Sequence, residues 1–392
     1  MKILYIHQYF FTPQSDGRIR SYHLAKALVA EGHTVELITS HNAPDYQHAD
    51  VEGISVHYLP IFYDNALGKW QRIRAFAAFV WKCYRLASRQ KADVCFATST
   101  PLSIGIIALL LKWLHGIPYI FEVRDLWPEA PIQLGFFRNP FYKKVLRGLE
   151  KIIYQNARHV VALSPSMADG VRKVCPQVPV SEIPNMADTE FYQPTTNPKG
   201  EQLLHKFSLD KILTITYIGT FGKANDLRQF LGLAQWWQTN APYPAQFVLA
   251  GAGAERPLLE NFIQENQLQN VRLLGHQNRM QVRELLAVSD FSYISFAQYP
   301  ILQTNSPNKF FDSIAAGLPC LINVQGWILE EIRRANCGFY ADPENHAHTF
   351  EQIHQLWQKP EAYAQMRQNA RLLAENKFSK AQAIQKFVAL FR

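Results

Sequence analysis

Short, continuous apolar runs alternate with helix-length segments along the whole chain, and this alternation limits the possible folds more than any other feature. The first two runs are residues 2–6 and 35–39, and the segment between them, residues 17–31, has apolar residues at helical spacing. Strands separated by helices of this length form parallel βαβ units. The runs are apolar at successive positions, as expected when helices cover both faces of a sheet. The pattern therefore predicts α/β domains built on doubly wound parallel sheets.

The alternation is interrupted once, in the middle of the chain. Residues 194–200 read PTTNPKG, a polar stretch of turn formers, and new strand-like runs begin at residue 213. Because domains commonly contain about 100–200 residues, we expect two of them here, over residues 1–195 and 200–375. Open α/β sheets bind ligands beyond the carboxyl ends of their strands, so two such domains predict a central ligand-binding cleft.

The chain carries 40 Lys and Arg against 32 Asp and Glu, a net charge of +8. This excess favours anionic partners, among them nucleotide diphosphates, lipid headgroups and nucleic acids. No recognisable nucleic-acid-binding module is present, which argues against nucleic acid as the partner. With 48% apolar and 13% aromatic residues, the composition is that of a globular chain rather than a disordered one.

Several features predict a cytoplasmic protein. The five cysteines are scattered and form no CxxC pair, which disfavours a disulfide framework or a zinc site and fits a reducing compartment. The first ten residues lead directly into a strand pattern, so we expect no signal peptide. The most apolar window, residues 101–121, is interrupted by Lys112, Gly116 and Pro118, which predicts a buried helix and strand rather than a membrane span.

Residues 5–20 place polar side chains after the first predicted strand. Gly17 is expected to open the following helix, whose N-terminal N–H groups, together with Arg20, would attract an anion. The alternative is an ordinary turn with a solvated arginine. His7 directly follows the strand and has either a structural or a catalytic role.

Residues 121–131, FEVRDLWPEAP, carry several charges out of a buried strand. Charged groups at such a position are costly unless they have partners, so Arg124 and Asp125 either pair with their neighbours or serve a ligand. In the second case the carboxylate of Asp125 can accept hydrogen bonds or a proton from a hydroxyl group.

Two glycine-containing turns follow strands in the second half of the chain. In residues 217–230, Gly219 and Gly222 would let the backbone approach a pyrophosphate, with Lys223 opposing its charge and a helix starting near Asn225. The spacing matches neither a Walker loop nor GxGxxG. After the next strand, Gly251 lies either beneath the same ligand or in a tight strand-to-helix connection.

The segment TNSPNKFFDSIAAGLPCL, residues 304–321, is the most specific motif of the chain. A turn at Ser306, Pro307 and Asn308 starts a helix and offers N–H groups to a ligand. Lys309 lies in the first helical turn, where a cation is unfavourable unless an anion is near. Asp312 follows Asn308 by one turn, so both can face one ligand.

Residues 69–91 are basic and aromatic, with Trp70, Phe76, Trp81 and Tyr84 at helical spacing among lysines and arginines. Such a helix can lie on an anionic membrane surface. The alternative is a helix packed on the sheet with a solvated basic face. The first alternative predicts peripheral contact with the inner face of the plasma membrane.

Taken in order, these segments resemble glycosyltransferase family 4, the large retaining group with the GT-B fold of two Rossmann-like domains. AKALVAEGHTVELIT matches the start of the family, and YIGTFGKANDL, GAGAERPLL and NSPNKFFDSIAAGLP match its carboxyl-terminal half. FEVRDLWPE is typical of the bacterial fucosaminyltransferase-like branch, which builds surface polysaccharides. The resemblance covers essentially the whole chain, and it implies that the last helix, residues 376–392, crosses back to the first domain.

The resemblance implies a nucleotide-sugar site in the second domain. Asp312 occupies the position of the glutamate that holds the ribose hydroxyls in the family, whereas Thr304 replaces the glutamate directed at the donor sugar. The family's Arg and Lys that clamp the diphosphate are also replaced, at residues 220–221 and near Asn225, which leaves Lys223 as the candidate substitute. The donor contacts that we expect from the motifs and the resemblance also include Gly17, Arg20, Gly219, Gly222, Asn225, Gly251, Ser306, Pro307, Asn308 and Lys309.

The implied activity is the retaining transfer of a hexosyl or N-acetylhexosaminyl group from a nucleotide-sugar, first of all a UDP-sugar, to a polyprenyl-linked or growing glycan. Arg124, Asp125 and Lys223 are its candidate catalytic residues, acting by positioning and electrostatic stabilisation. The family implies no metal, and the sequence has no DxD triplet. Two alternatives remain: a sugar-nucleotide epimerase of the same fold, and a noncatalytic sugar-nucleotide-binding subunit, which Thr304 and the missing clamp arginine favour.

Overall fold

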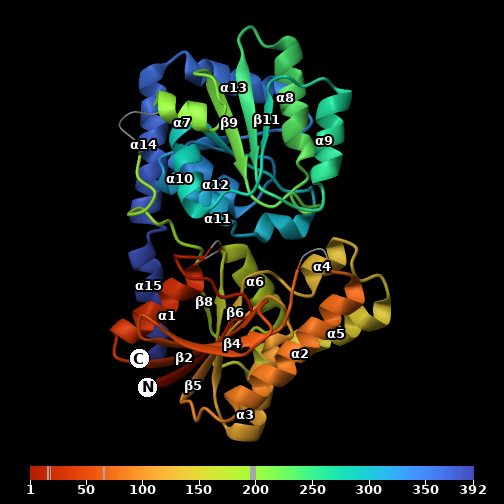
Figure 1. Cartoon of the computed structure of the whole chain (residues 1–392), viewed down its shortest axis with the longest axis vertical. Coiled ribbons are helices and arrows are strands. Elements are labelled where there is room, and N and C mark those ends of the chain that lie inside the picture. Colours follow the sequence, from red (N-terminus) through yellow and green to blue (C-terminus); the bar gives the residue numbers. More distant parts are fainter. Residues whose placement is uncertain (16, 18, 65–66, 195–199) are drawn as a thin grey trace. The chain divides into compact units, whose positions relative to one another are not determined.

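The computed structural model describes residues 1–15, 17, 19–64, 67–194 and 200–392 (Figure 1). The expected domain boundary falls largely on residues 195–199, which lie outside the described residues. Strands and helices alternate along the described chain, and all but one of the strand pairs are parallel. The α/β class and the doubly wound parallel sheets that the sequence predicts are thus confirmed.

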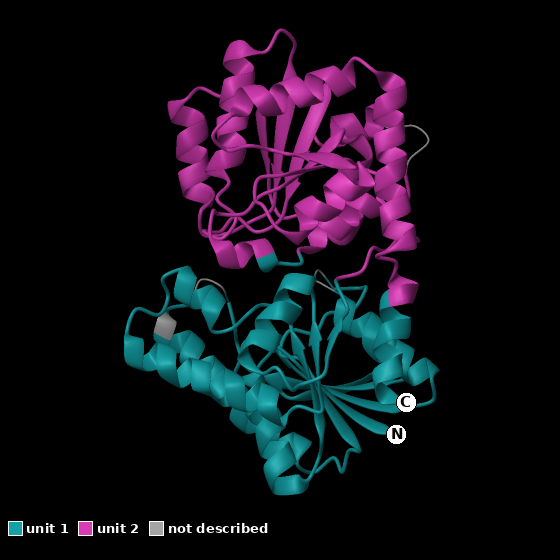
Figure 2. Ribbon diagram, turned by 180° about the vertical axis from the view of Figure 1, so that it is seen from behind, with its two compact units in different colours: residues 1–184, 304–306, 383–392 teal, residues 185–303, 307–382 magenta. Residues whose placement is uncertain are grey.

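The chain divides into two compact units, coloured separately in Figure 2. Unit 1 contains the start of the chain and also its last ten residues. Unit 1 comprises residues 1–184, 304–306 and 383–392, and unit 2 comprises residues 185–303 and 307–382.

Unit 1 is built on an eight-stranded sheet with the strand order β3-β4-β2-β1-β5-β6-β7-β8. Only β3 runs antiparallel to its neighbour. The sequence did not predict this edge strand, because its residues are mostly exposed and form no apolar run. The strands are β1 (Lys2–Ile6), β2 (Thr34–His41), β3 (Gln47–Val51), β4 (Ile54–Pro60), β5 (Val94–Thr98), β6 (Tyr119–Val123), β7 (His159–Ala162) and β8 (Val180–Glu182).

The helices of unit 1 connect these strands and cover the sheet. The apolar window at 101–121 forms a buried helix and a buried strand, as its interruptions predict. The last residues of the chain complete the core, since Phe387 packs edge-on against Phe96 of β5 at a centroid distance of 4.9 Å. The helices are α1 (Arg20–Ala30), α2 (Lys69–Ala87), α3 (Ile104–His115), α4 (Glu129–Gln133), α5 (Pro140–Asn156) and α6 (Pro165–Val174).

Unit 2 has a six-stranded, all-parallel sheet with the order β11-β10-β9-β12-β13-β14. Phe230 lies at the centre of its core, against Phe247 and Tyr293. The strands are β9 (Leu213–Ile218), β10 (Ala245–Ala250), β11 (Val271–Leu274), β12 (Phe291–Ile294), β13 (Cys320–Ile322) and β14 (Gly338–Tyr340).

Helices surround this second sheet, and the region after residue 345 consists of consecutive helices, as predicted. A short 3₁₀ helix, Pro300–Thr304, precedes α11. The helices are α7 (Glu201–Lys206), α8 (Arg228–Asn240), α9 (Arg256–Glu265), α10 (Arg279–Val288), α11 (Asn308–Ala315), α12 (Trp327–Ala335), α13 (His346–Trp357), α14 (Pro360–Asn376) and α15 (Lys380–Val388), the last of which passes from unit 2 into unit 1.

Candidate functional site

The two glycine turns of unit 2 pack directly on one another at the carboxyl ends of β9 and β10. The amide of Gly219 donates to the Ala250 carbonyl at 2.9 Å, and the amide of Gly251 donates to the Gly275 carbonyl at 3.1 Å. A Cβ on Gly251 would lie 1.9 Å from the Gly219 carbonyl oxygen. Gly251 therefore serves the tight connection between the turns, and both amides are used inside the unit rather than presented to a pyrophosphate.

A lysine from α11 reaches the first of these turns. The ammonium of Lys309 donates to the Tyr217 hydroxyl at 2.9 Å and to Oδ1 of Asn225 at 3.3 Å. It also lies 4.0 Å from the centroid of the Tyr217 ring. A Cβ on Gly219 would come within 3.2 Å of the ammonium, so a glycine there makes room for the lysine. The structure thus brings Gly219, Asn225 and Lys309 together.

Lys223, the substitute cation that the sequence suggested, has an exposed side chain in the same turn. The turn is longer than predicted, because α8 begins at Arg228 instead of near Asn225. Asp226 adopts a left-handed conformation with φ of 39°, which interrupts any earlier helical start. Gly222 accepts a hydrogen bond from the Asn225 amide at 2.8 Å, so this glycine shapes the turn that holds Asn225.

The most specific motif forms the start of α11, as predicted. Pro307 is the N-cap and Asn308 the first helical residue, and no side chain caps the helix. Asp312 is half-buried one turn after Asn308. Burial raises the pKa of Tyr192, and the negative charge of the nearby Asp312 carboxylate raises it further. Ser306 belongs to the three-residue segment that groups with unit 1.

In unit 1, a histidine and an arginine meet beyond the ends of two strands. Nη1 of Arg124, after β6, donates to Nε2 of His7, after β1, at 3.1 Å. The Arg124 amide donates to Oγ of Ser99, which follows the intervening strand β5. Burial, together with the charge of Arg124, lowers the pKa of His7 well below its usual range. His7 is therefore a neutral acceptor that orients the guanidinium, a pairing that sequence spacing did not reveal.

Arg20 is part of a buried ion pair. Its Nε and Nη2 donate to Oε1 of Glu122 at 3.1 and 2.9 Å, and Nη1 and Nη2 donate to the carbonyls of Pro184 and Ile183. Both side chains of the pair are almost fully buried. Each of the three nitrogens is engaged, so this arginine is not presented to a ligand as the sequence suggested. Glu122 on a buried strand was the available signal, because a buried carboxylate requires a cation.

The glycine that was expected to open the first helix lies before it. The helix α1 begins at Arg20, with Ile19 as its N-cap, three residues later than predicted. Gly17 is in a bend, where a Cβ would lie 2.2 Å from the ring of Phe11. Its small size thus serves close packing. Asp125 is half-buried after β6, and its carbonyl accepts a hydrogen bond from the amide of Trp127.

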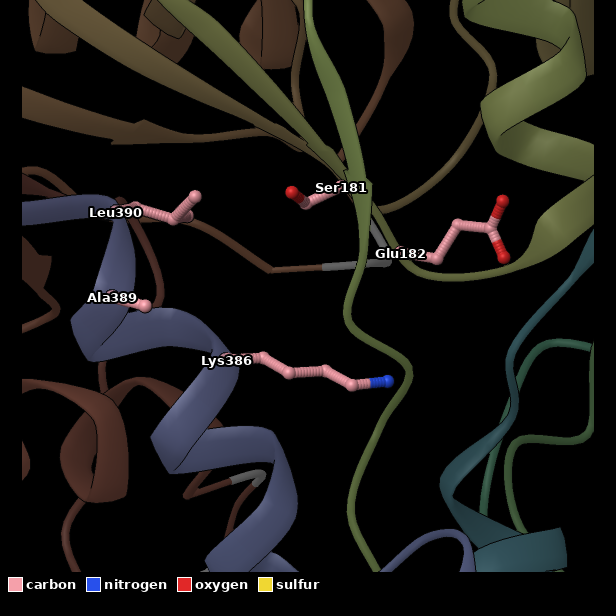
Figure 3. Close-up of a pocket in the computed structure, with 5 residues that line it drawn as sticks. All are labelled: Ser181, Glu182, Lys386, Ala389 and Leu390. Carbon is pink, nitrogen blue, oxygen red and sulfur yellow. The ribbon is translucent and has the colours of Figure 1, made fainter.

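A hollow of about 460 Å³ lies in unit 1, between β8 and the last residues of the chain. Figure 3 shows its lining side chains, among which Glu182 and Lys386 are charged. The residues described as lining it include none of the candidate site residues. Across the described part of the chain, no group of three or more His, Cys, Asp and Glu side chains is arranged to hold a metal ion. No described helix is long and apolar enough to cross a membrane.

Family comparison identifies both halves of the molecule. Residues 17–186 match the glycosyl transferase 4-like domain, and residues 205–373 match glycosyl transferases group 1. The chain belongs to the group 1 glycosyltransferases. The resemblance inferred from the sequence motifs is thereby confirmed at the level of the family, and the two matches together span most of this glycosyltransferase.

Solved structures with the same fold cover nearly the whole glycosyltransferase. Sucrose-phosphate synthase from Thermosynechococcus elongatus aligns with a TM-score of 0.81 at 16% identity over 100% of this chain and 98% of its own. Anabaena HepE in complex with UDP and glucose aligns with a TM-score of 0.71 at 14% identity over 100% and 99%. WaaG, a glycosyltransferase involved in lipopolysaccharide biosynthesis, aligns with a TM-score of 0.72 at 14% identity over 99% of both chains. These similarities confirm the GT-B fold.

A curated relative matches a smaller region. It is the UDP-N-acetylglucosamine–N-acetylmuramyl-(pentapeptide) pyrophosphoryl-undecaprenol N-acetylglucosamine transferase of Geobacillus thermodenitrificans, 26% identical over 132 residues. The match covers 29% of this glycosyltransferase and 36% of the relative. The chain thus spans about a third of the length of the curated relatives that it matches.

Proposed function

We propose that the protein transfers a sugar, with retention of anomeric configuration, from a UDP-sugar to a polyprenyl-linked or growing glycan in bacterial surface polysaccharide synthesis. The observation that carries the donor half of this proposal is the position of Lys309 at the Gly219 turn. HepE, which shares the fold, was solved with UDP and glucose, and the curated relative acts on a pyrophosphoryl-undecaprenol acceptor.

In this proposal Lys309 replaces the missing diphosphate clamp. It donates to Asn225, the residue that stands near the family's clamp lysine, so the cation reaches the same place from another element. An ammonium there stabilises the negative charge that develops on the departing diphosphate. The first turn of α11 disfavours a cation by its dipole, and an anionic ligand offsets that cost. Asp312, one turn later, accepts hydrogen bonds from the ribose hydroxyls.

The acceptor half of the proposal assigns the strand ends of unit 1 to the acceptor. His7 fixes the guanidinium of Arg124 through its neutral imidazole, and Asp125 is the adjacent carboxylate. The hydroxyl that attacks is oriented by these groups, while the departing phosphate takes its proton. Gly17 and Arg20 have packing roles in this assignment, because one lies against Phe11 and the other is paired with Glu122.

A noncatalytic sugar-nucleotide-binding subunit is the second candidate, favoured by Thr304 at the position of the family's sugar-directed glutamate.

The proposed transferase is also expected to work on the cytoplasmic side of a membrane, with the basic helix 69–91 in contact with anionic lipid. This helix is α2, on which Trp70 and Trp81 are exposed.

The decisive experiment has two stages. Thermal-shift measurements with UDP-, GDP- and dTDP-sugars identify the donor, because a ligand that binds only the folded state raises the melting temperature. Product analysis with the stabilising donor, with and without a polyprenyl-diphosphate glycan, then separates the candidates. A glycosylated lipid supports the transferase, an altered nucleotide-sugar formed without acceptor indicates the epimerase, and donor binding without any product indicates the noncatalytic subunit.

A further inference from the structure

The helix α5 has two apolar faces that point in opposite directions. Ile153 and Tyr154 on one face are buried in unit 1. On the other face Phe141, Val145 and Ile152 are 68%, 51% and 41% exposed. Their spacings of four and seven residues put them on one stripe along the helix. The stripe is not needed to hold α5 in place, since the helix already packs on α3 and α6.

The surroundings of this stripe are basic. Lys144 and Lys151 are exposed on the same helix, whereas its only acidic residue, Glu150, is buried. Phe136 and Tyr142, at 59% and 58% exposure, extend the apolar surface around the start of the helix. Exposed apolar side chains flanked by lysines are the pattern of helices that lie in the interface of a bilayer.

The two units differ in net charge and in exposed apolar surface. Unit 1 contains 23 Lys and Arg and 14 Asp and Glu, a formal charge of +9, whereas unit 2 contains 17 and 18, a charge of −1. Of the 17 large hydrophobic side chains exposed in the described chain, 14 belong to unit 1. Positive charge and exposed apolar surface are therefore concentrated in one unit, which is the combination that an anionic lipid surface attracts.

The neighbours of α5 add to this surface. The helix α3 contacts both α2 and α5. At its carboxyl end Trp113 and Leu114 are 57% and 64% exposed, and Nε1 of Trp113 donates to Oδ1 of Asn156 at the end of α5. Tryptophan is enriched at the level of lipid headgroups because its ring is apolar and its N–H is polar.

We propose that the stripe Phe141, Val145 and Ile152 of α5 inserts into the interface of an anionic bilayer, as a contact additional to that of α2. A second copy of the chain fits less well, because a symmetric contact would bring the lysines of both copies together. The membrane contact deepens the proposed function by presenting unit 1 to a lipid-linked acceptor, but it can be measured without donor or acceptor.

The test is vesicle co-sedimentation of the full chain with phosphatidylcholine alone and with phosphatidylcholine mixed with phosphatidylglycerol. The triple variant Phe141→Ser, Val145→Ser, Ile152→Ser is expected to bind the anionic vesicles at least ~10-fold more weakly. The matched control is Leu258→Ser, Met280→Ser, Leu372→Ser, which removes the three large hydrophobic residues that are exposed in the described part of unit 2 and should bind as the wild type does. Unchanged melting temperatures show that both variants are folded.

The charge contribution is tested separately. Lys144→Gln with Lys151→Gln should weaken binding to anionic vesicles by about 25-fold, since each lysine near such a surface contributes about a factor of five. The control pair Lys173→Gln with Lys211→Gln removes two exposed lysines elsewhere and should have little effect. Equal binding to neutral and anionic vesicles would contradict the proposal.

Three further outcomes would overturn the inference. The first is that the wild type does not bind lipid. The second is that the stripe variant binds vesicles as strongly as the wild type does. The third is that the wild type and the control variant form a concentration-dependent dimer, whereas the stripe variant does not. The variant Lys309→Ala separates the two proposals, because it should keep vesicle binding while losing donor affinity. Lipid binding without any donor binding would defeat the proposed function and leave the stripe proposal standing.

Discussion

At the carboxyl ends of the unit 1 strands, charged side chains are held by ion pairs and hydrogen bonds to other side chains. At the carboxyl ends of the unit 2 strands, the main contacts are between backbone turns. Unit 1 buries the Arg20–Glu122 pair and fixes Arg124 on His7. Unit 2 packs two glycine turns against each other and brings a half-buried lysine to them. The difference shows that similar sheets can support a site either by internal ion pairs or by close backbone contact. A different kind of substitution should therefore destabilise each unit.

Removal of the buried carboxylate should be the most damaging change. Glu122→Ala leaves the Arg20 guanidinium buried without its anion, which costs about 3–5 kcal/mol of stability. Urea unfolding measures the loss. The control is Glu182→Ala, which breaks an exposed pair with Arg172 and should cost less than about 1 kcal/mol. Similar losses in the two variants would remove the distinction on which the comparison rests.

The corresponding weak point of unit 2 is a glycine. Gly251→Ala places a Cβ against the Gly219 carbonyl at a φ of +149°, so we expect a loss of about 2–4 kcal/mol from overpacking and strain. Gly275→Ala is the matched control, because a Cβ there would meet nothing within 4 Å. Thermal unfolding of both variants checks this, and a stable Gly251→Ala protein would show that the turns are not tightly packed.

Lys309 should affect binding more than stability. Lys309→Ala is expected to lower the affinity for the donor by about 10- to 100-fold, since charge-assisted contacts to phosphate are strong. Its melting temperature without ligand should stay close to that of the wild type. Lys223→Ala, which removes an exposed lysine of the same turn, is the comparison. Calorimetric titration with the donor decides between the two lysines, and a larger loss in the Lys223 variant would restore the original assignment.

The buried imidazole of unit 1 should give a pH-dependent stability. Because the pKa of His7 is lowered in the folded state, the unfolded chain takes up a proton first as the pH falls below about 6.5. Stability is then lost toward acid by up to about 1.4 kcal/mol per pH unit. His7→Gln should remove this contribution, which urea unfolding at pH 7 and pH 5 measures. An unchanged slope in the variant would mean that His7 is charged in the folded protein.

Chelation should have the smallest effect. If a cation from α11 takes the place of the family's clamp, EDTA is expected to leave the transfer rate within about twofold of its untreated value, since the charge of the diphosphate is met by the protein. Transfer assays with and without EDTA, and with Mg²⁺ restored, test this. A loss of activity that Mg²⁺ reverses would show that Lys309 does not suffice.

The overall architecture could be predicted from the sequence because local residue patterns determine where the strands and helices lie. Continuous apolar runs identify β1, β5 and β9, and the Ser-Pro-Asn turn identifies the start of α11. What it did not predict are contacts between distant residues. His7 and Arg124 are separated by 117 positions, and no local pattern shows that they share a hydrogen bond.

The candidate site shows the same limit. The pattern placed a cation beside the Gly219 turn but chose Lys223, which is near in sequence, over Lys309, which is near in space. Gly251 was recognised as significant, but only the position of the Gly219 carbonyl shows that its size serves packing. Local spacing thus finds which residues matter, whereas the packing of the elements decides what each of them contacts.

The return of the chain to its first domain has a consequence for biosynthesis. Phe387 and Phe391 fill part of the interior around Phe96, so unit 1 acquires its full core only after residues 383–392 have been synthesised. The later half has every strand of its own sheet before that moment. Unit 1 therefore stays incomplete during synthesis until unit 2 has been made, and a frameshift before residue 383 would damage the core of unit 1 as well as the segment that it alters.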